Sequence, residues 1–360
     1  MKNKQIRIFQ MLPHLYYGDG VGNDALAIDR IIKELGYPTQ IYADEIDRRI
    51  AKGLAETAEK MPEIQANDVI IYHLSTGADM NKRVENLAGR KIMIYHNITP
   101  AFYFKNYSLA SMEACENGRN DLDKLSDKVE YCLADSEYNK LELMAHNYTC
   151  KVDVLPILIP FEDYEKEPDK DIISKYKDGW TNIIFVGRIA PNKKQEDIIK
   201  TFYYYKKYVN PKSRLFLVGS YKGMERYYQK LMKYVQELQI EDVNFTGHTR
   251  FEEILAYYRI ADVFVCMSEH EGFCIPLIEA MYFDMPIVAY ACTGVEGTLA
   301  GAGLTMKEKD CMVAAEMIRM LTENEELRDK VLKGQKKRLQ DFAYEKTRQQ
   351  FIGYLKGFVE

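Results

Sequence analysis

Short apolar runs alternate with helical patterns along almost the whole chain, and this alternation limits the possible folds more than any other feature. Strands that alternate with helices predict a parallel sheet covered by helices on both faces. The alternation stops once, at residues 156–179, where Pro160, Pro168 and a charged run predict a linker with a short helix. We therefore expect two α/β units, with strands at residues 5–10, 39–43, 68–73, 91–95, 131–134 and 151–155, and then at 182–186, 214–218, 243–245, 263–266 and 286–290.

The linker divides the 360 residues into two domains of ordinary size. We predict a first α/β domain at residues 1–160 and a second at 161–340. Residues 341–360 are predicted to form a C-terminal helix that packs back on the first domain, because Phe351, Tyr354, Leu355 and Phe358 recur at helical spacing. Open parallel sheets bind ligands beyond the carboxyl ends of their strands, so we expect the ligand in a cleft between the domains.

Charge and composition narrow the class of protein. The 49 Lys and Arg against 54 Asp and Glu give a net charge of −5, which argues against a nucleic-acid-binding protein. The seven cysteines include no Cys-x-x-Cys pair, so reduced, packed thiols are expected rather than disulfides or a zinc site. No apolar run approaches the roughly 20 residues of a membrane span, and Arg7 interrupts the first apolar run, which argues against a signal peptide. We therefore expect a cytoplasmic protein.

Residues 268–280, which read SEHEGFCIPLIEA, carry the first chemical signal. A predicted strand ends just before them, and Pro276 suits the first turn of a helix predicted at residues 277–283. The first N–H groups of such a helix lack partners and carry the positive end of the helix dipole, so the turn favours an anion such as a phosphate. Glu271 and Glu279 flank the turn and can hold two hydroxyl-bearing parts of one ligand. The alternatives are an exposed helix carboxylate for Glu279 and a helix-start partner of the dipole for Glu271.

The second signal lies on the loop after the first strand of the second domain. Gly187 ends this strand, and Arg188 and Lys193 follow five residues apart, before a helix. Two fixed cations at the carboxyl end of a strand suit a pyrophosphate and stabilise the charge of a departing diphosphate. The alternative is a solvated loop in which both are surface charges. The Glu271 turn in the same domain favours the ligand-binding interpretation.

Together these motifs resemble the retaining glycosyltransferases of family 4. The resemblance rests on Gly187-Arg188 with Lys193, on Glu271-x7-Glu279 within Glu-Gly-Phe-x-x-Pro-x-x-Glu-Ala, and on Gly247 at the end of Asn244-Phe245-Thr246-Gly247. It is most specific over residues 183–303, and the first half matches more loosely through the glycine loop at residues 18–22 and through His96. The resemblance implies the GT-B fold, an α/β architecture of two Rossmann-like domains facing across a cleft. In such enzymes the first domain binds the acceptor and the second binds the nucleotide-sugar donor.

Carried over by position, the resemblance assigns a role to each motif residue. Arg188 and Lys193 would contact the diphosphate, and Glu279 the ribose hydroxyls. Glu271 would meet the transferred sugar, which His96 would approach from the first domain. The expected catalytic residues are therefore His96, Arg188, Lys193 and Glu271, and the expected donor-binding residues are Gly18, Gly20, Gly22, Gly187, Gly247, Gly272, Phe273, Cys274, Ile275 and Glu279.

The implied activity is transfer of a sugar, with retained anomeric configuration, from a UDP- or GDP-sugar to a carbohydrate or glycolipid acceptor. Such a reaction belongs to the synthesis of surface polysaccharides or glycoconjugates, and the acceptor would bring the protein to the inner face of the membrane. The phosphate of the departing diphosphate would help to take the acceptor proton. The protein then supplies orientation and charge stabilisation. Neither a cofactor nor a metal is expected.

Several residues near the motifs have structural interpretations. His73 ends the strand before that of His96, and it either lines the acceptor side or is structural. His270 is expected to be a solvated loop residue, and the run Tyr203-Tyr204-Tyr205 is expected to pack rather than stack on a ligand. Two Asp-x-Asp patterns, Asp121-Leu122-Asp123 and Asp169-Lys170-Asp171, match one that other glycosyltransferases use for metal, and we interpret both as surface charge.

The chain also departs from the family pattern. Cys274 stands where a small residue is usual, and Lys194 follows Lys193 where the family has glycine. In a later loop, Glu296-Gly297 departs from the order of residues that is usual in the family. The nearer alternatives are a sugar-nucleotide epimerase or a sugar phosphorylase of the same architecture. An NAD-dependent oxidoreductase is suggested by the glycine loop and Asp44, although Asn23 breaks Gly-x-Gly-x-x-Gly. A non-catalytic sugar-nucleotide sensor is the remaining alternative.

Overall fold

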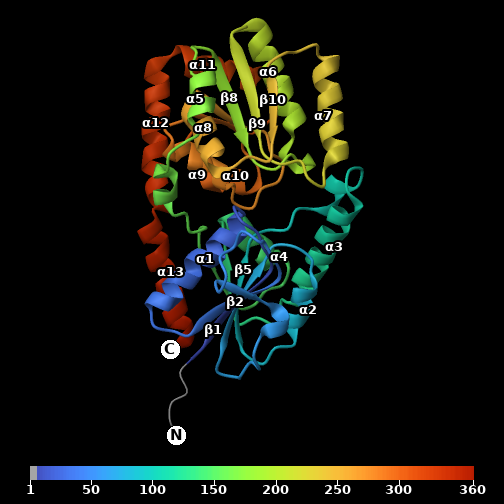
Figure 1. The fold of residues 1–360 in the computed structure, drawn as a ribbon, viewed down its shortest axis with the longest axis vertical. Helices are drawn as coiled ribbons and strands as arrows, with labels where there is room; N and C mark the ends of the chain where they lie inside the picture. The colour runs from blue at the N-terminus through green and yellow to red at the C-terminus, as the bar shows by residue number, and fades with distance from the viewer. Residues whose placement is uncertain (1–5) are drawn as a thin grey trace. The chain divides into compact units, whose positions relative to one another are not determined.

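The computed structural model describes residues 6–360, which form two α/β units (Figure 1). Unit 1 contains the chain up to Phe102, then Ala110–Pro160 and Phe342–Glu360. Unit 2 contains Tyr103–Leu109 and Phe161–Asp341. Unit 1 is therefore assembled from segments on both sides of unit 2 in the sequence.

The sheet of unit 1 has seven parallel strands in the order β3-β2-β1-β4-β5-β6-β7. Gln5 of the first predicted strand lies outside the described residues, and the strand continues beyond residue 10 to Leu15. Pro13 lies within β1 and is tolerated there, because the register with β2 passes from Leu12 to His14 and leaves Pro13 without a paired position. The strands are β1 Ile8–Leu15, β2 Thr39–Ile46, β3 Ala55–Thr57, β4 Val69–Leu74, β5 Arg90–Tyr95, β6 Tyr131–Ala134 and β7 Lys151–Val154.

Helices lie on both sides of this sheet (Figure 1). One face packs against the C-terminal helix, whose Phe351, Leu355 and Phe358 share a buried cluster with Ile71 and Ile94 of the sheet. The C-terminal helix thus belongs to unit 1, and the apolar spacing that predicted it marks its buried face. The helices are α1 Gly20–Glu34, α2 Asp79–Glu85, α3 Leu109–Lys124, α4 Glu137–Ala145 and α13 Tyr344–Val359, with 3-10 turns at η1 Ala58–Lys60 and η2 Ala101–Phe104.

The sheet of unit 2 has six parallel strands in the order β10-β9-β8-β11-β12-β13. They are β8 Thr181–Val186, β9 Ser213–Val218, β10 Val243–Gly247, β11 Val263–Cys266, β12 Ile287–Tyr290 and β13 Leu304–Met306. The helices are α5 Lys170–Tyr176, α6 Gln195–Tyr208, α7 Glu225–Glu237, α8 Phe251–Ile260, α9 Ile275–Tyr282, α10 Thr293–Leu299, α11 Cys311–Glu323 and α12 Glu325–Leu339, with 3-10 turns at η3 Phe161–Glu165, η4 Pro191–Lys193 and η5 Gln340–Phe342.

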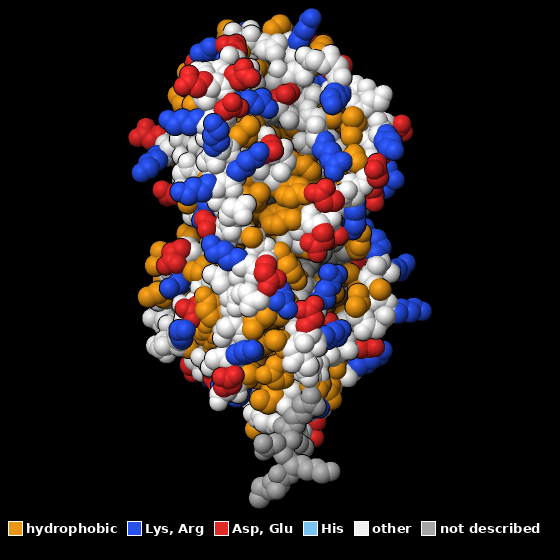
Figure 2. Space-filling view, turned by 90° about the vertical axis from the view of Figure 1, so that its left-hand side faces the viewer, with side chains coloured by type: hydrophobic (Ala, Val, Ile, Leu, Met, Phe, Trp, Pro, Cys, Tyr) orange, Lys and Arg blue, Asp and Glu red, His pale blue; other side chains and the backbone are white. Residues whose placement is uncertain are grey.

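The surface carries charges of both signs. Figure 2 shows Lys and Arg side chains interspersed with Asp and Glu side chains over the visible face, with hydrophobic side chains between them. Among the helices of residues 6–360, none combines the length and apolarity that spanning a lipid bilayer requires.

Candidate functional site

The turn from β11 to α9 has the strand-to-helix form that the sequence predicts. β11 ends at Cys266 and α9 begins at Ile275, two residues earlier than predicted, with Pro276 in its first turn. Cys274 precedes the helix in the left-handed region, at φ 72° and ψ 68°, and its side chain does not cap the helix. Pro276 has no N–H and the N–H of Leu277 donates to the carbonyl oxygen of Cys274 at 3.1 Å, so an anion is favoured here chiefly by the positive end of the α9 dipole.

Lys193 and Glu271, predicted from separate motifs, are in contact. Lys193 ends η4, and its Nζ lies 2.5 Å from Oε2 of Glu271, a residue only 6% exposed. Burial alone would lower the pKa of Lys193, but the neighbouring carboxylate outweighs this effect and raises that pKa above its ordinary value. Lys193 is therefore a fixed ammonium ion beside the start of α9.

Arg188 has a different environment. It follows β8 and is exposed, and its guanidinium has no ion-pair partner within residues 6–360. The backbone around it is tightly packed, because a Cβ at Gly219 would lie 2.0 Å from the carbonyl oxygen of Gly187. The strand ends of β8 and β9 thus approach too closely for any side chain at Gly219. Arg188 extends from this rigid junction and remains available to a ligand.

Glu279 is half-buried rather than an exposed helix carboxylate. Its Oε1 accepts a hydrogen bond from the hydroxyl of Tyr164 at 2.9 Å, and its Oε2 accepts one from Tyr258 at 2.5 Å. Burial raises the pKa of Glu279, and the two phenolic bonds oppose that rise by stabilising the carboxylate. Neither tyrosine could be predicted from the motifs, because Tyr164 lies in the predicted linker and Tyr258 on a different helix.

The loop after β11 is held by α10. The backbone N–H of Glu271 donates to Oγ1 of Thr293 at 2.9 Å, and Thr298 donates to the carbonyl oxygen of Phe273. A Cβ at Gly294 would lie 2.1 Å from the carbonyl oxygen of Gly272, so the helix and the loop are in backbone contact. Glu296, whose place in the family pattern was uncertain, is exposed on α10.

His270 was predicted to be a solvated loop residue, and this prediction is wrong. His270 is 5% exposed, its ring lies 6.3 Å from that of Tyr103, and its carbonyl oxygen accepts a hydrogen bond from Asn192 at 3.1 Å. The loop folds onto η4, which removes the side chain from solvent. The sequence could not show this contact, because 78 residues separate its partners.

Thiols surround the same turn. All seven cysteines of the chain are free, in agreement with the expected reduced thiols. Sulfur and carboxylate atoms of Cys266, Glu271 and Cys274 lie within 4.8 Å of one another, a set that could hold a soft metal ion. Lys193 already pairs with the carboxylate of this set, so a metal ion would compete with the ammonium group.

In unit 1, His96 is part of a buried hydrogen-bond chain. Its side chain is 1% exposed, its Nδ1 lies 3.0 Å from Oδ2 of Asp135, and its Nε2 lies 2.9 Å from Nδ1 of His73. Nε2 of His73 in turn lies 2.9 Å from Oε1 of Gln10. The structure thus brings together two histidines that the sequence predicts and two polar partners that it does not.

The glycine loop is shorter than predicted. Gly18 has a φ of 75°, which favours glycine, but α1 begins at Gly20 and therefore includes Gly20 and Gly22 in its first turn. Asp19 caps the helix by accepting from the backbone N–H of Gly22 at 3.3 Å. In unit 2, Gly247 ends β10 with a φ of 70°. Each of these glycines is thus at or near the end of an element.

One Asp-x-Asp interpretation is wrong. Asp121 is buried on α3, where its Oδ2 accepts a hydrogen bond from Asn81 at 2.9 Å. Its inward position follows from the rotation of α3 on the sheet, which a short sequence pattern does not specify. Asp169 caps α5 through its Oδ1, and Asp171 is exposed. Among the three tyrosines of α6, Tyr205 is buried in the core.

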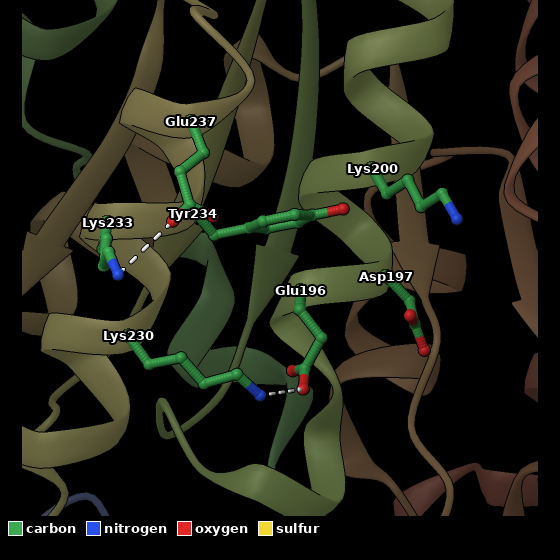
Figure 3. Close-up of a pocket in the computed structure, with 7 residues that line it drawn as sticks. All are labelled: Glu196, Asp197, Lys200, Lys230, Lys233, Tyr234 and Glu237. Carbon is green, nitrogen blue, oxygen red and sulfur yellow. Dashed lines mark hydrogen bonds and ion pairs between the residues drawn. The ribbon is translucent and has the colours of Figure 1, made fainter.

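A separate cavity of about 380 Å³ lies between α6 and α7 (Figure 3). Tyr234 extends from α7 toward α6, and Glu196 pairs with Lys230 at 3.0 Å. The remaining lining residues are Asp197, Lys200, Lys233 and Glu237. The cavity contains none of the motif residues, and its lining mixes three acidic with three basic side chains, of which Glu196 pairs with Lys230 and Glu237 with Lys233.

Comparison with known proteins supports the interpretation of unit 2. Residues 166–338 match the family model described as Glycosyl transferases group 1. The chain is 27% identical over 210 residues to a trehalose synthase of Thermococcus litoralis, an alignment that covers 56% of this chain and 48% of that protein. It is 24% identical over 190 residues to the O-antigen chain mannosyltransferase B of Escherichia coli, covering 51% of this chain and 49% of the relative. The chain thus spans about half the length of these curated relatives.

The fold extends over both units. Anabaena HepE, whose crystal structure contains UDP and glucose, superposes with a TM-score of 0.75 at 15% identity, covering 98% of this chain and 100% of that one. The two parallel-sheet units and this match show that the chain has the GT-B fold. At this level of identity the similarity establishes the fold and leaves the activity to the chemistry of the site.

Proposed function

We propose that this protein is a glycosyltransferase that transfers a sugar from a nucleoside-diphosphate sugar. The observation that carries the proposal is the buried contact of Lys193 with Glu271 at the N-terminal end of α9, inside the segment that matches the glycosyltransferase model. The fixed ammonium of Lys193 and the positive end of the α9 dipole lie together where a diphosphate would accumulate negative charge. Both stabilise that charge more as the sugar bond breaks, which is the condition for acceleration.

The surrounding residues suit the rest of a donor. Arg188, exposed and without an ion pair among the described residues, supplies a second cation for the diphosphate. Glu279 is fixed by two phenols and keeps further lone pairs on each oxygen, which can accept bonds from ribose hydroxyls. Glu271 and the backbone of Gly272, Phe273, Cys274 and Ile275 then meet the phosphate and the sugar.

The finer proposal follows the resemblance to family 4. Unit 2 binds a UDP- or GDP-hexose and unit 1 binds a carbohydrate or lipid-linked acceptor. Transfer retains the anomeric configuration, with the leaving phosphate helping to take the acceptor proton. The reaction needs neither a cofactor nor a metal at the diphosphate. It occurs in the cytoplasm, at the inner face of the membrane where the acceptor is lipid-linked, during polysaccharide or glycoconjugate synthesis.

Donor binding is the first test. We expect one of UDP, GDP or ADP, alone or as its sugar, to raise the melting temperature of the full chain, with no loss after EDTA treatment. Arg188→Ala should reduce this shift, because it weakens nucleotide binding by about 1.5 to 3 kcal/mol, the range for one hydrogen bond to a charged group. Lys233→Ala on α7 is the matched control in the same unit. No shift with any nucleotide, or a shift with NAD alone, would contradict the proposal.

Product analysis is the second test. A bound donor incubated with carbohydrate and glycolipid acceptors should give a glycoside whose anomeric configuration, measured by proton NMR, equals that of the donor. Donor binding without any turnover would indicate a sensor. Conversion of the donor to its epimer, or phosphate-dependent cleavage of a sugar, would identify the two nearer alternatives.

A further inference from the structure

A chain of buried polar side chains crosses unit 1. It begins with Gln10 on β1, continues through His73 on β4 and His96 just after β5, and ends with Asp135 just after β6. These four strands are neighbours in the sheet, so the chain runs across it near the carboxyl ends of its central strands. Successive distances are 2.9, 2.9 and 3.0 Å, and each of the four side chains is buried.

The proton on His73 can be assigned from its partner. The amide nitrogen of Gln10 donates to the carbonyl oxygen of Ala25 at 3.0 Å, so the amide oxygen of Gln10 faces His73. Nε2 of His73 must therefore carry the hydrogen. Burial lowers the pKa of His73 well below its ordinary value, so the ring is neutral and its Nδ1 is an acceptor.

This assignment determines the next proton. Because Nδ1 of His73 accepts, Nε2 of His96 must donate across the 2.9 Å contact. The two ring planes differ by 8° and their centroids are 5.2 Å apart, which places the rings edge to edge on one line. Asp24, His73 and His96 have ligand atoms within 4.8 Å of one another, but two nitrogens that point at each other suit a shared proton rather than a shared metal.

Carboxylates provide the opposite charge. Asp135 meets Nδ1 of His96, and Asp24 on α1 and Asp19 before α1 add their fields. Burial alone would lower the pKa of His96, but these carboxylates outweigh it and raise the pKa above its ordinary value. Burial also raises the pKa of Asp135, but the geometry places a hydrogen in each contact of His96, one between Nε2 and Nδ1 of His73 and one between Nδ1 and Oδ2 of Asp135.

We propose that Gln10 and His73 are positioning residues that keep His96 doubly protonated, so that His96 acts as a fixed cation and hydrogen-bond donor and not as a proton acceptor. The assignment of protons depends on unit 1 alone. Its consequence for transfer rests on the proposed function and on the role that the resemblance gives His96, which would approach the sugar: the acceptor proton must then go elsewhere than to His96.

The direct test is NMR of the full chain labelled with 15N-histidine, which contains six histidines. Substitutions of single histidines assign the signals. At pH 7.5 we expect His73 to show one protonated nitrogen, Nε2, and His96 to show two. A His73 protonated at Nδ1, or a His96 with only one protonated nitrogen, overturns the proposal without any variant and without any assay of transfer.

A variant tests the role of Gln10. Gln10→Leu removes the acceptor that fixes His73, so we expect the His73 proton to redistribute to Nδ1 and His96 to lose a proton at pH 7.5. Gln40→Leu on β2 is the matched control and should leave both spectra unchanged. An unchanged His73 and His96 in a folded Gln10→Leu protein contradicts the positioning role. If Gln10→Leu fails to fold, the wild-type spectrum decides.

Turnover gives a separate reading once a donor and acceptor are known. Because the pKa of His96 is raised in the wild type, wild-type activity should persist to higher pH than that of Gln10→Leu. In Gln10→Leu, where Nε2 of His96 becomes an acceptor, the ratio of activity at pH 7.5 to activity at pH 5.5 should be several-fold below the wild-type ratio. A variant that is uniformly slower at all pH values contradicts the proposal. Absence of transfer by the wild type would contradict the proposed function and leave the NMR result standing.

Discussion

Asp24 gives the sharpest quantitative prediction. It lies buried on α1, where its Oδ1 accepts a hydrogen bond from the backbone N–H of Leu158 at 2.9 Å. Burial raises the pKa of Asp24 from its ordinary 3.8 to about 7, with a smaller opposing effect from the charge of His96. Asp24→Asn keeps the carbonyl acceptor for Leu158 and removes the titration.

The magnitude follows from linkage. Between pH 3.8 and about pH 7 the folded chain holds a proton on Asp24 that the unfolded chain has released. The free energy of unfolding therefore falls as pH rises, by about 1.4 kcal/mol per unit. Over roughly three units this amounts to about 4 kcal/mol. Wild type and Asp24→Asn should thus differ little near pH 4, and the variant should be more stable by up to about 4 kcal/mol at pH 8.

The assay is urea unfolding of both proteins at pH 4.5, 5.5, 6.5, 7.5 and 8.5. The difference in the free energy of unfolding should grow across this range and level off above pH 7. Asp178→Asn is the control, because Asp178 is exposed, binds Arg214, and has a pKa lowered to about 2. Its difference from wild type should be flat above pH 4.5. A flat difference for Asp24→Asn as well would refute the reasoning.

Further substitutions test packing and charge in unit 2 by urea unfolding. Gly294→Ala should lower the free energy of unfolding by about 1–3 kcal/mol, because the added Cβ meets the backbone of Gly272. Gly297→Ala lies in the same helix with open space around it and should raise the free energy of unfolding by up to about 1 kcal/mol. Equal effects would contradict the close contact of α10. Tyr258→Phe removes a hydroxyl donor from the half-buried carboxylate of Glu279 and should cost about 1.5–3 kcal/mol, and an unchanged stability would contradict this bond. Lys193→Met leaves Glu271 without its partner and should cost about 3–5 kcal/mol. Adding Glu271→Gln should restore part of that loss, and no restoration would contradict the pairing.

The strands that the sequence predicts are those with a recognisable apolar run. β6 and β11 have the predicted bounds, because each is buried throughout its length and preceded by a charged residue, Glu130 and Asp262. β3 and β13 were not predicted. Each has three residues and lies at the edge of its sheet, so neither is long enough to show periodicity. The sheets as a whole could be predicted, whereas their edges depend on tertiary pairing.

The residues of the candidate site also include some that local motifs predict and others that only distant contacts determine. Lys193 and Glu271 could be predicted because each lies in a motif at the end of a strand. Gln10 and Tyr164 could not, because their importance comes from partners 63 and 115 residues away. The inward orientation of Asp121 was missed for the same reason, since the rotation of a helix on its sheet is decided by packing. Local patterns thus predict which loops matter and not which distant side chains hold them.

The return of α13 to unit 1 has a consequence for biosynthesis. Phe351, Leu355 and Phe358 cover strands formed by the first half of the chain. α13 can therefore cover this apolar face of the sheet only after residue 358 has left the ribosome. Unit 2 ends at Asp341 and is available for folding first. During the interval the strands of unit 1, which end at Val154, lack the helix that packs on Ile71 and Ile94. The protein therefore depends on its final helix to close a unit whose synthesis began at the other end of the chain.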